Sequence, residues 1–292
     1  MRAVSTPVHL LEAGIITEQR WLGMAEAPGV LASEIAALAR PAKRVRIPFL
    51  PRDRYLTAAR ESCRTLADAV VASLQDGARC LVVGGECTIV AGAISGALTV
   101  EPDVALAYFD AHGDFNTLAT TPSHFVGGMC LAHVCGKKLA PLLWPGARTI
   151  AEDRVALVGA RNLDPGEAGN LVASKVRQVP FDPERSDAPG LLAFARKRPL
   201  WVHIDVDIVD PAEIPAVDYP AAGGPSVRAL CDVLTALANV AKVRGVEICG
   251  YDPRKDVGPR PLVPSLARIA VAALRSSQGA TPPSTPDALL TR

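Results

Sequence analysis

The sequence has no excess of charge of either sign, no long apolar run and no recognisable targeting segment. Lysine and arginine number 31 and aspartate and glutamate 30, so the formal charge of +1 gives no electrostatic reason to expect nucleic acid or a membrane as a partner. No apolar run approaches the roughly 18 to 20 residues of a membrane span. The N-terminus lacks the apolar core and cleavage pattern of a signal peptide. We therefore expect a cytosolic protein.

The chain also has no CxxC motif. Its cysteines are odd in number and most lie in apolar contexts, at Cys63, Cys80, Cys87, Cys130, Cys135, Cys231 and Cys249. This usage is typical of a reduced intracellular protein with buried thiols rather than of a disulfide framework. Cys87 is the exception, because it lies beside Glu86 at the end of a short apolar run.

What the sequence does have is enough apolar material for one large α/β domain. The 292 residues are 49% hydrophobic, and we expect a single domain over 1–275 and a disordered tail over 276–292. Strands are predicted at 80–83, 104–109, 155–158, 176–179, 200–204 and 243–249, alternating with helices such as 59–74, 89–98, 227–240 and 264–274. Residues 1–50 are expected to be irregular, apart from a helix at 31–39 and a strand at 45–49.

This alternation predicts a parallel sheet with helices on its faces. The pattern alone allows an open three-layer sheet or a closed barrel. Metal-dependent hydrolases built on barrels often carry a His-x-His pair after an early strand, and this sequence has none. The open sheet is therefore favoured.

The segment YFDAHGDFN, residues 108–116, is the strongest local indication of chemistry. An apolar strand ends there, and Asp110, His112 and Asp114 follow at alternate positions. In extended backbone such residues point to one side, and two carboxylates with an imidazole suit a divalent metal.

Two other predicted strand ends carry similar side chains. The run WVHIDVD places Asp205 and Asp207 two residues apart, and LVVGGECT places Glu86 and Cys87 after a short apolar strand. The carboxyl ends of parallel strands gather at one edge of a sheet, where ligands bind. Four aspartates exceed the need of one ion, so the sequence predicts a binuclear centre.

These stretches resemble the ureohydrolase superfamily, the arginases and agmatinases, from about Val82 to Pro253. GGECT is similar to the family motif GGDHS, DAHGDFNT to DAHxDxNT, HIDVDIVDP to SxDxDxxDP, and CGYDP to EVNP. The resemblance implies a three-layer α/β/α fold around a parallel sheet, two divalent ions, usually Mn²⁺, and a trimer or hexamer. It also implies hydrolysis of a guanidine group, releasing a urea.

The resemblance also assigns metal ligands. It implies that Asp114 and Asp205 bridge the ions, with Asp114 counted as catalytic. Asp110 and Cys87 would complete the site of one ion, and His112 and Asp207 that of the other. Cys87 stands where the family has a histidine, and a thiolate suits Zn or Fe better than Mn. The alternative is that Cys87 is a buried structural thiol.

Two further departures lie at the reactive end of the implied pocket. Gly127 replaces a histidine that arginases are thought to use for proton transfer, and Gly250 replaces a glutamate that holds the guanidinium. We expect other residues to compensate, namely His124 or Glu247 as catalytic groups. His203 is expected either to support the metal ligands or to be structural, and Tyr219 to narrow the pocket.

The other end of the implied pocket matches the family. Arginases hold the α-carboxylate and α-amino group of arginine through residues that correspond here to Asn116, Ser123, Asp164 and Glu167. Because agmatine lacks an α-carboxylate, this end favours an arginine-type amino acid.

Together the departures and the matches imply a guanidine altered at its terminal nitrogen. Within the family the Cys-for-His exchange resembles the Nω-hydroxy-L-arginine hydrolases of D-cycloserine biosynthesis, whose products are L-ornithine and hydroxyurea. Ordinary arginase activity, another guanidino substrate and a non-catalytic protein that binds an arginine-like ligand are the alternatives. Four converging carboxylates argue against the last, because without a metal they would repel one another.

Overall fold

A computed structural model describes residues 6–137, 140–182, 187–258 and 260–275. Eight strands form one sheet in the order β2-β1-β3-β8-β7-β4-β5-β6, and every neighbouring pair is parallel. The strands are β1 (Val8–Ala13), β2 (Lys43–Arg46), β3 (Arg79–Gly84), β4 (Ala105–Phe109), β5 (Val155–Val158), β6 (Arg177–Val179), β7 (Pro199–Asp205) and β8 (Lys242–Cys249). The sheet is open, as predicted.

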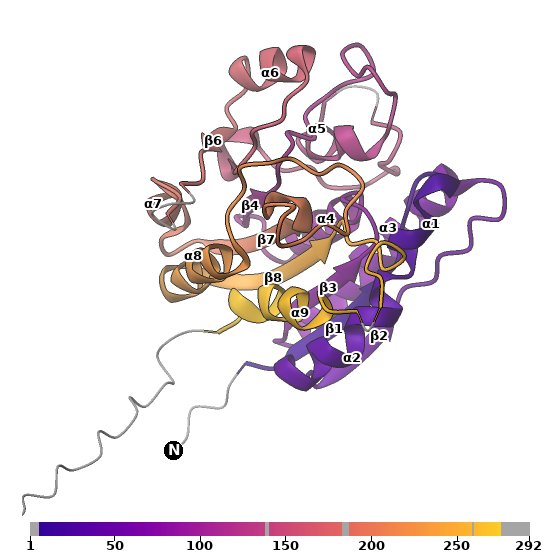
Figure 1. Cartoon of the computed structure of the whole chain (residues 1–292), viewed down its shortest axis with the longest axis vertical. Coiled ribbons are helices and arrows are strands. Elements are labelled where there is room, and N and C mark those ends of the chain that lie inside the picture. The colour runs from indigo at the N-terminus through magenta and orange to yellow at the C-terminus, as the bar shows by residue number, and fades with distance from the viewer. Residues whose placement is uncertain (1–5, 138–139, 183–186, 259, 276–292) are drawn as a thin grey trace, which may run out of the picture.

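Helices cover both faces of the sheet and make three layers (Figure 1). The α-helices are α1 (Leu22–Ala25), α2 (Ala27–Ala39), α3 (Tyr55–Gln75), α4 (Ile89–Val100), α5 (Cys130–Val134), α6 (Pro165–Val172), α7 (Leu191–Ala195), α8 (Val227–Val240) and α9 (Val263–Ala272). Apolar residues of α2, α7, α8 and α9 pack in one core cluster, and those of α3, α4 and α5 in another. Short 3₁₀ turns lie at Gln19–Trp21, Gly127–Met129, Glu152–Arg154 and Val206–Ile208.

The four middle strands β3, β8, β7 and β4 are almost fully buried. Along β7, Val202 packs in the first core cluster and its neighbour Trp201 in the second, as expected for a strand covered on both faces. Strands β3 and β8, and strands β7 and β4, are neighbours in the sheet although they are not consecutive in the chain. Their carboxyl ends therefore bring together side chains that the sequence keeps far apart.

The prediction that residues 1–50 are mostly irregular is wrong. Strand β1 lies between β2 and β3 and pairs with both. Its sequence, VHLLEA, includes a glutamate that interrupts the apolar pattern. Glu12 is nonetheless buried, because Arg44 of the neighbouring strand donates to its carboxylate at 2.7 Å. The strand therefore depends on a tertiary ion pair, which a local pattern does not reveal.

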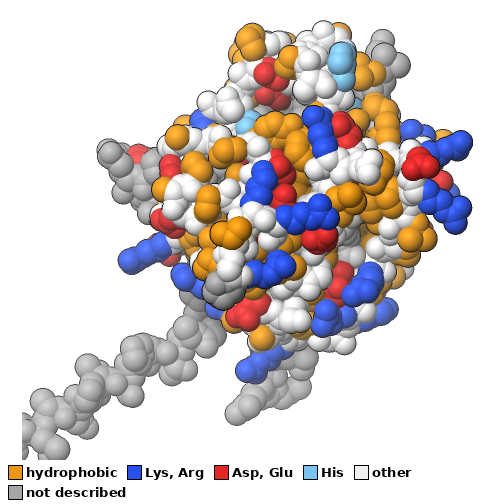
Figure 2. Space-filling view, turned by 45° about the vertical axis from the view of Figure 1, so that its right-hand side comes forward, with side chains coloured by type: hydrophobic (Ala, Val, Ile, Leu, Met, Phe, Trp, Pro, Cys, Tyr) orange, Lys and Arg blue, Asp and Glu red, His pale blue; other side chains and the backbone are white. Residues whose placement is uncertain are grey.

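One helical stretch, Gln19–Ala39, is long and apolar enough by length and composition to cross a membrane. It consists of a 3₁₀ turn and helices α1 and α2, and contains Pro28. Leu31 and Ile35 of α2 pack in the first core cluster beneath the sheet. These contacts are those of a core helix. On the face seen in Figure 2, basic and acidic side chains are interspersed. The predicted tail over 276–292 lies outside the described residues.

Candidate metal centre

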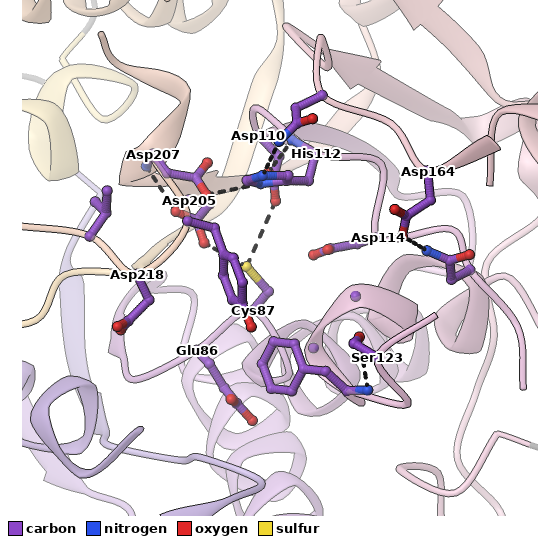
Figure 3. A pocket seen from close by; sticks show the side chains of 18 of the residues that line it. Glu86, Cys87, Asp110, His112, Asp114, Ser123, Asp164, Asp205, Asp207 and Asp218 are labelled. Atoms are coloured by element: carbon purple, nitrogen blue, oxygen red, sulfur yellow. Dashed lines mark hydrogen bonds and ion pairs between the residues drawn. The ribbon is translucent and has the colours of Figure 1, made fainter. Parts of the chain in front are cut away.

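The ends of β3, β4, β7 and β8 open onto one cavity (Figure 3). The predicted metal ligands all line it, as do the four predicted substrate-binding residues: Cys87, Asp110, His112, Asp114, Asp205, Asp207, Asn116, Ser123, Asp164 and Glu167. We refer to Asp110, His112, Asp114, Asp205 and Asp207 as the carboxylate cluster. We refer to Asn116, Ser123, Asp164 and Glu167 as the polar flank.

The imidazole of His112 lies between two carboxylates of the carboxylate cluster. Its Nδ1 is 3.3 Å from Oδ1 of Asp110 and 3.0 Å from Oδ2 of Asp207. Backbone N–H groups fix both acids, since His112 N donates to Asp110 and Ala111 N donates to Asp207. The three side chains offer ligand atoms within 4.8 Å of one another, which is the spacing of a metal site.

Asp114 and Asp205 are held by different partners. Asp114 has a left-handed backbone (φ 49°), and its Oδ2 accepts hydrogen bonds from the Tyr108 hydroxyl at 2.5 Å and the Cys130 thiol at 3.2 Å. Asp205 accepts from Asp207 N at 2.8 Å and from the Cys87 thiol at 2.8 Å. Asp205 thus joins the carboxylate cluster to Cys87.

Asp110 belongs to two candidate metal groups, one with His112 and Asp207 and one with Cys87 and Asp114. The resemblance implies that Asp114 and Asp205 bridge the ions, and this assignment stays a prediction. In the structure the carboxylate shared by the two groups is that of Asp110, because Oδ1 lies near His112 and Oδ2 is 3.8 Å from the Cys87 thiol.

The carboxylate cluster is electrostatically unfavourable without a cation. Burial and the neighbouring Asp207 carboxylate raise the pKa of Asp110 and of Asp205 well above its usual range. Burial lowers the pKa of His112, but Asp110 and Asp207 outweigh it and raise the value to about 12. Buried like charges of this kind are stabilised by bound metal, which also displaces the imidazole proton.

Cys87 also belongs to a deeper group, the thiol cluster, with His203 and Cys249. The Cys87 and Cys249 sulfurs are 3.6 Å apart, and the Cys249 sulfur is 3.5 Å from His203 Nε2. His203 Nδ1 in turn lies 2.7 Å from Glu247 Oε1. The sequence prediction singled out Cys87 of this cluster as a ligand and did not include Cys249.

Two predicted catalytic residues are not brought to the cavity. Glu247 is fully buried and contacts His203, because its position on β8 is two residues deeper in the sheet than Cys249. His124 is exposed, with a left-handed backbone, and does not line the cavity. Neither the predicted acid or base, His124, nor the residue predicted to face the guanidine, Glu247, therefore lines the cavity. Tyr219 does line the cavity, with its ring 6.1 Å from that of His112.

Three residues of the polar flank, Asn116, Asp164 and Glu167, form a connected hydrogen-bond network. Asn116 Nδ2 donates to Asp164 Oδ2 at 2.9 Å. Glu167 Oε1 accepts from Phe115 N at 2.8 Å, and Oε2 from Asp164 N at 3.3 Å. Asp164 and Glu167 form the capping box of α6, a helix that is not among the predicted elements. Ser123 accepts from Phe125 N at 3.2 Å.

The arginase family model matches residues 24–276. The chain belongs to the arginase family. It is 30% identical over 206 residues to the Nω-hydroxy-L-arginine amidinohydrolase of Streptomyces lavendulae, covering 69% of this chain and 71% of that protein. It is 30% identical over 239 residues to the arginase of Bacillus caldovelox, covering 78% of each. The Bacillus subtilis arginase structure superposes with a TM-score of 0.81 at 21% identity, covering 94% and 99% of the two chains.

Arginase-family proteins are hydrolases of C–N bonds in linear amidines, and this chain is an amidinohydrolase for guanidino substrates. The family depends on a binuclear metal centre, typically of Mn²⁺. The residues present fit such a centre, because buried carboxylates and an imidazole at ligand spacing converge at the cavity.

Both glycines that depart from the arginase-family motifs are sterically fixed. Gly250 has φ +84°, and a Cβ there would overlap Oδ1 of Asp205. A Cβ at Gly127 would overlap the ring of Phe125, which occupies that space and lines the cavity. The residues that arginases carry at these positions therefore cannot be accommodated without rearrangement of Asp205 and Phe125.

Several site residues were not recognised in the sequence. Tyr108 and Cys130 donate hydrogen bonds to Asp114. Cys249 contacts Cys87. The ring of Phe125 occupies the space that a side chain at position 127 would need. The sequence does carry a signal for Cys249. The segment HIDVD places His203 and Asp205 at alternate positions of one strand, and EIC places Glu247 and Cys249 at alternate positions of another. Using it required knowing that β7 and β8 are neighbours.

Proposed function

We propose that this arginase-family chain hydrolyses Nω-hydroxy-L-arginine to L-ornithine and hydroxyurea. The observation that supports it is the contrast between the two ends of the cavity. The polar flank keeps the groups expected for an amino acid, whereas Gly250 and Phe125 leave the guanidine end without the family's glutamate and histidine.

The chemistry of an N-hydroxyguanidine fits this contrast. It is less basic than guanidine, so it depends less on a carboxylate partner for its charge. Its leaving fragment also depends less on a proton donor. The relative from Streptomyces lavendulae, which is named for this substrate, is similar to the chain over 206 residues.

We assign the binding roles as follows. Asp164 and Glu167 take the α-ammonium group of the substrate, and Asn116 and Ser123 take its carboxylate. The carboxylate cluster and Cys87 hold two divalent ions, with Mn²⁺ expected at the side of His112, and Asp114 contributes to catalysis as one of the metal ligands. When bound, the ions supply a water of lowered pKa as the nucleophile. A trimer or hexamer and a cytosolic location remain predictions.

The test is release of ornithine by the Mn-loaded protein with Nω-hydroxy-L-arginine and L-arginine side by side. We expect kcat/KM to be at least about tenfold higher for the hydroxylated substrate, which corresponds to about 1.4 kcal/mol in the barrier. Agmatine serves as the control for the polar flank, because it lacks the carboxylate, and it should be hydrolysed poorly.

Three outcomes would contradict the proposal. Preference for plain L-arginine would make the chain an arginase and would require another group to hold the guanidinium. Hydrolysis of neither amino acid with two metal equivalents bound would indicate a different guanidino substrate. A protein that hydrolyses neither amino acid and also retains no metal would be a non-catalytic ligand-binding protein.

A further inference from the structure

Beneath the cavity, the thiol cluster of Cys87, His203 and Cys249 is a second set of possible metal ligands. The register of β7 and β8 pairs His203 with Glu247 and Asp205 with Cys249. All these side chains are buried; Cys87 and Asp205 line the cavity, and His203 and Cys249 lie behind it. The cluster therefore adjoins the carboxylate cluster but is built from different atom types.

The distances within the thiol cluster agree with tetrahedral coordination. Around Zn²⁺, with sulfur at about 2.3 Å and nitrogen at about 2.0–2.1 Å, two sulfurs lie about 3.8 Å apart and a sulfur and a nitrogen about 3.5 Å. The structure has 3.6 Å between the Cys87 and Cys249 sulfurs and 3.5 Å between the Cys249 sulfur and His203 Nε2. Little movement is needed to receive an ion.

Asp205 adjoins the thiol cluster at Cys87, from where it would supply a fourth ligand. Its Oδ2 lies 2.8 Å from the Cys87 sulfur, where it accepts a hydrogen bond from the thiol. A thiol gives up its proton when it binds a metal, which removes this hydrogen bond. Asp205 and Cys87 can then separate to the spacing of two ligands of one ion.

His203 has the surroundings of a metal-binding histidine. Its Nε2 faces the Cys249 sulfur, and its other ring nitrogen lies 2.7 Å from the carboxylate of the fully buried Glu247. A carboxylate on the far nitrogen fixes the tautomer and the ring orientation of metal-bound histidines. The ring also stacks on Tyr108 with centroids 4.0 Å apart and planes at 6°. The imidazole is thus held in one orientation.

We propose that Cys87, Cys249 and His203, completed by Asp205, bind a thiophilic divalent ion of the Zn²⁺ class. Two thiolates and an imidazole prefer such an ion to Mn²⁺, which is better matched by the carboxylates around His112. The centre is then two chemically different positions side by side. This inference goes beyond the proposed function, because it concerns metal identity and holds for any guanidino substrate.

The test measures metal binding without substrate. The chelated protein is loaded with Co²⁺ as a spectroscopic substitute for Zn²⁺, and we expect a thiolate-to-cobalt charge-transfer band that one equivalent of Zn²⁺ abolishes. Cys249→Ser should lose the band and one equivalent of tightly bound Zn²⁺. Cys63→Ser is the matched control, since Cys63 is equally buried but donates to the Thr88 carbonyl instead; it should keep both.

Glu247→Gln provides a second test that removes no ligand. Loss of the carboxylate on His203 should weaken Zn²⁺ binding about 10- to 100-fold and leave Mn²⁺ binding unchanged. Absence of a charge-transfer band in the wild-type protein, or a band unaffected by both variants, would overturn the proposal. Because ornithine release is measured separately, failure here is distinguishable from failure of the proposed function.

Discussion

The carboxylate cluster and the polar flank lie on the same cavity, yet they differ in how their charges are balanced. In the polar flank, Asp164 accepts from an amide group, and both oxygens of Glu167 accept from backbone N–H groups. In the carboxylate cluster, Asp110 and Asp205 lie near other acids, and burial with Asp207 raises the pKa of each. The flank is complete as folded, whereas the cluster needs cations.

This difference separates binding from catalysis. A network whose hydrogen bonds are already made in the folded protein can position a substrate before metal binds. Little further conformational entropy is then lost when the substrate binds. In the carboxylate cluster, by contrast, the buried carboxylates repel one another until metal binds. Metal affinity and folding are therefore coupled there. Variants in the two regions should therefore differ in their response to chelation.

Asp205→Ala should give the largest effect, because Asp205 joins Cys87 to the carboxylate cluster. We expect loss of both metal equivalents and a fall in activity of at least about 10³-fold, which corresponds to about 4 kcal/mol in the barrier. The chelated variant should unfold at a higher temperature than the chelated wild type, since a buried carboxylate has been removed.

Metal analysis and thermal unfolding with and without chelator check this expectation. Asp218→Ala is the matched control, because Asp218 lines the same cavity but pairs with Lys255 at 2.6 Å. It should keep both metals. Retention of two equivalents by Asp205→Ala would contradict the assignment of Asp205 as a shared ligand.

The pH dependence of the unfolding free energy should report on Glu167 of the polar flank. Burial, reinforced by Asp114 and opposed by the Phe115 N–H, raises the pKa of Glu167 to about 7. A raised carboxyl pKa contributes stability below its unfolded value, about 4.5, and this stability is lost as the pH rises to about 7. Relative to Glu167→Gln, the wild type should lose at most about 3 kcal/mol of unfolding free energy across this window.

Denaturant unfolding of the chelated proteins at several pH values measures this difference. Glu213→Gln is a suitable control, because Glu213 also accepts a backbone N–H, from Val227, but is more exposed. Parallel pH profiles for wild type and Glu167→Gln would show that the two backbone hydrogen bonds, rather than burial, govern the Glu167 carboxyl.

Much of the middle of the sheet could be predicted from the sequence. The runs at 80–83, 104–109, 200–204 and 243–249 correspond to β3, β4, β7 and β8, because strands buried on both faces are largely apolar. The polar residues buried within these runs, His203 and Glu247, pair with each other. Strand β1 could not be predicted in this way, because Glu12 is compensated by an arginine from another strand. Helix α6 is not among the predicted helices, and its first turn, DPGE, has the composition of a surface turn.

The candidate site shows the same division. The acids at strand ends could be predicted, since alternation along one strand is a local property. The contact of Cys87 with Cys249, and the burial of Glu247 behind the cavity, depend on which strands are neighbours. Phe125 filling the space beside Gly127 depends on the path of a loop. None of these three features is encoded in a local pattern.

Gly250→Ala should destabilise the protein through the carboxylate cluster. An added Cβ would combine a left-handed backbone with overlap of the Asp205 carboxylate, for a total of about 2 kcal/mol. Gly77→Ala is the matched control, because Gly77 has φ +74° and open space around its Cβ position. Gly77→Ala should lower the unfolding free energy by about 1 kcal/mol, through the backbone conformation alone. Equal losses in unfolding free energy would show that Asp205 moves aside freely.

Asp164→Ala should give the smallest effect on folding and act on binding rather than chemistry. Removal of the N-cap of α6 should cost about 1 kcal/mol of unfolding free energy. Because Asn116 also loses its partner, KM for the amino-acid substrate should rise with kcat largely retained, the pattern of lost uniform binding. Metal content should be unchanged. Asp68→Ala, at an exposed position of α3, controls for the loss of one surface charge. A fall in kcat or in bound metal would mean that the polar flank and the carboxylate cluster are one coupled unit.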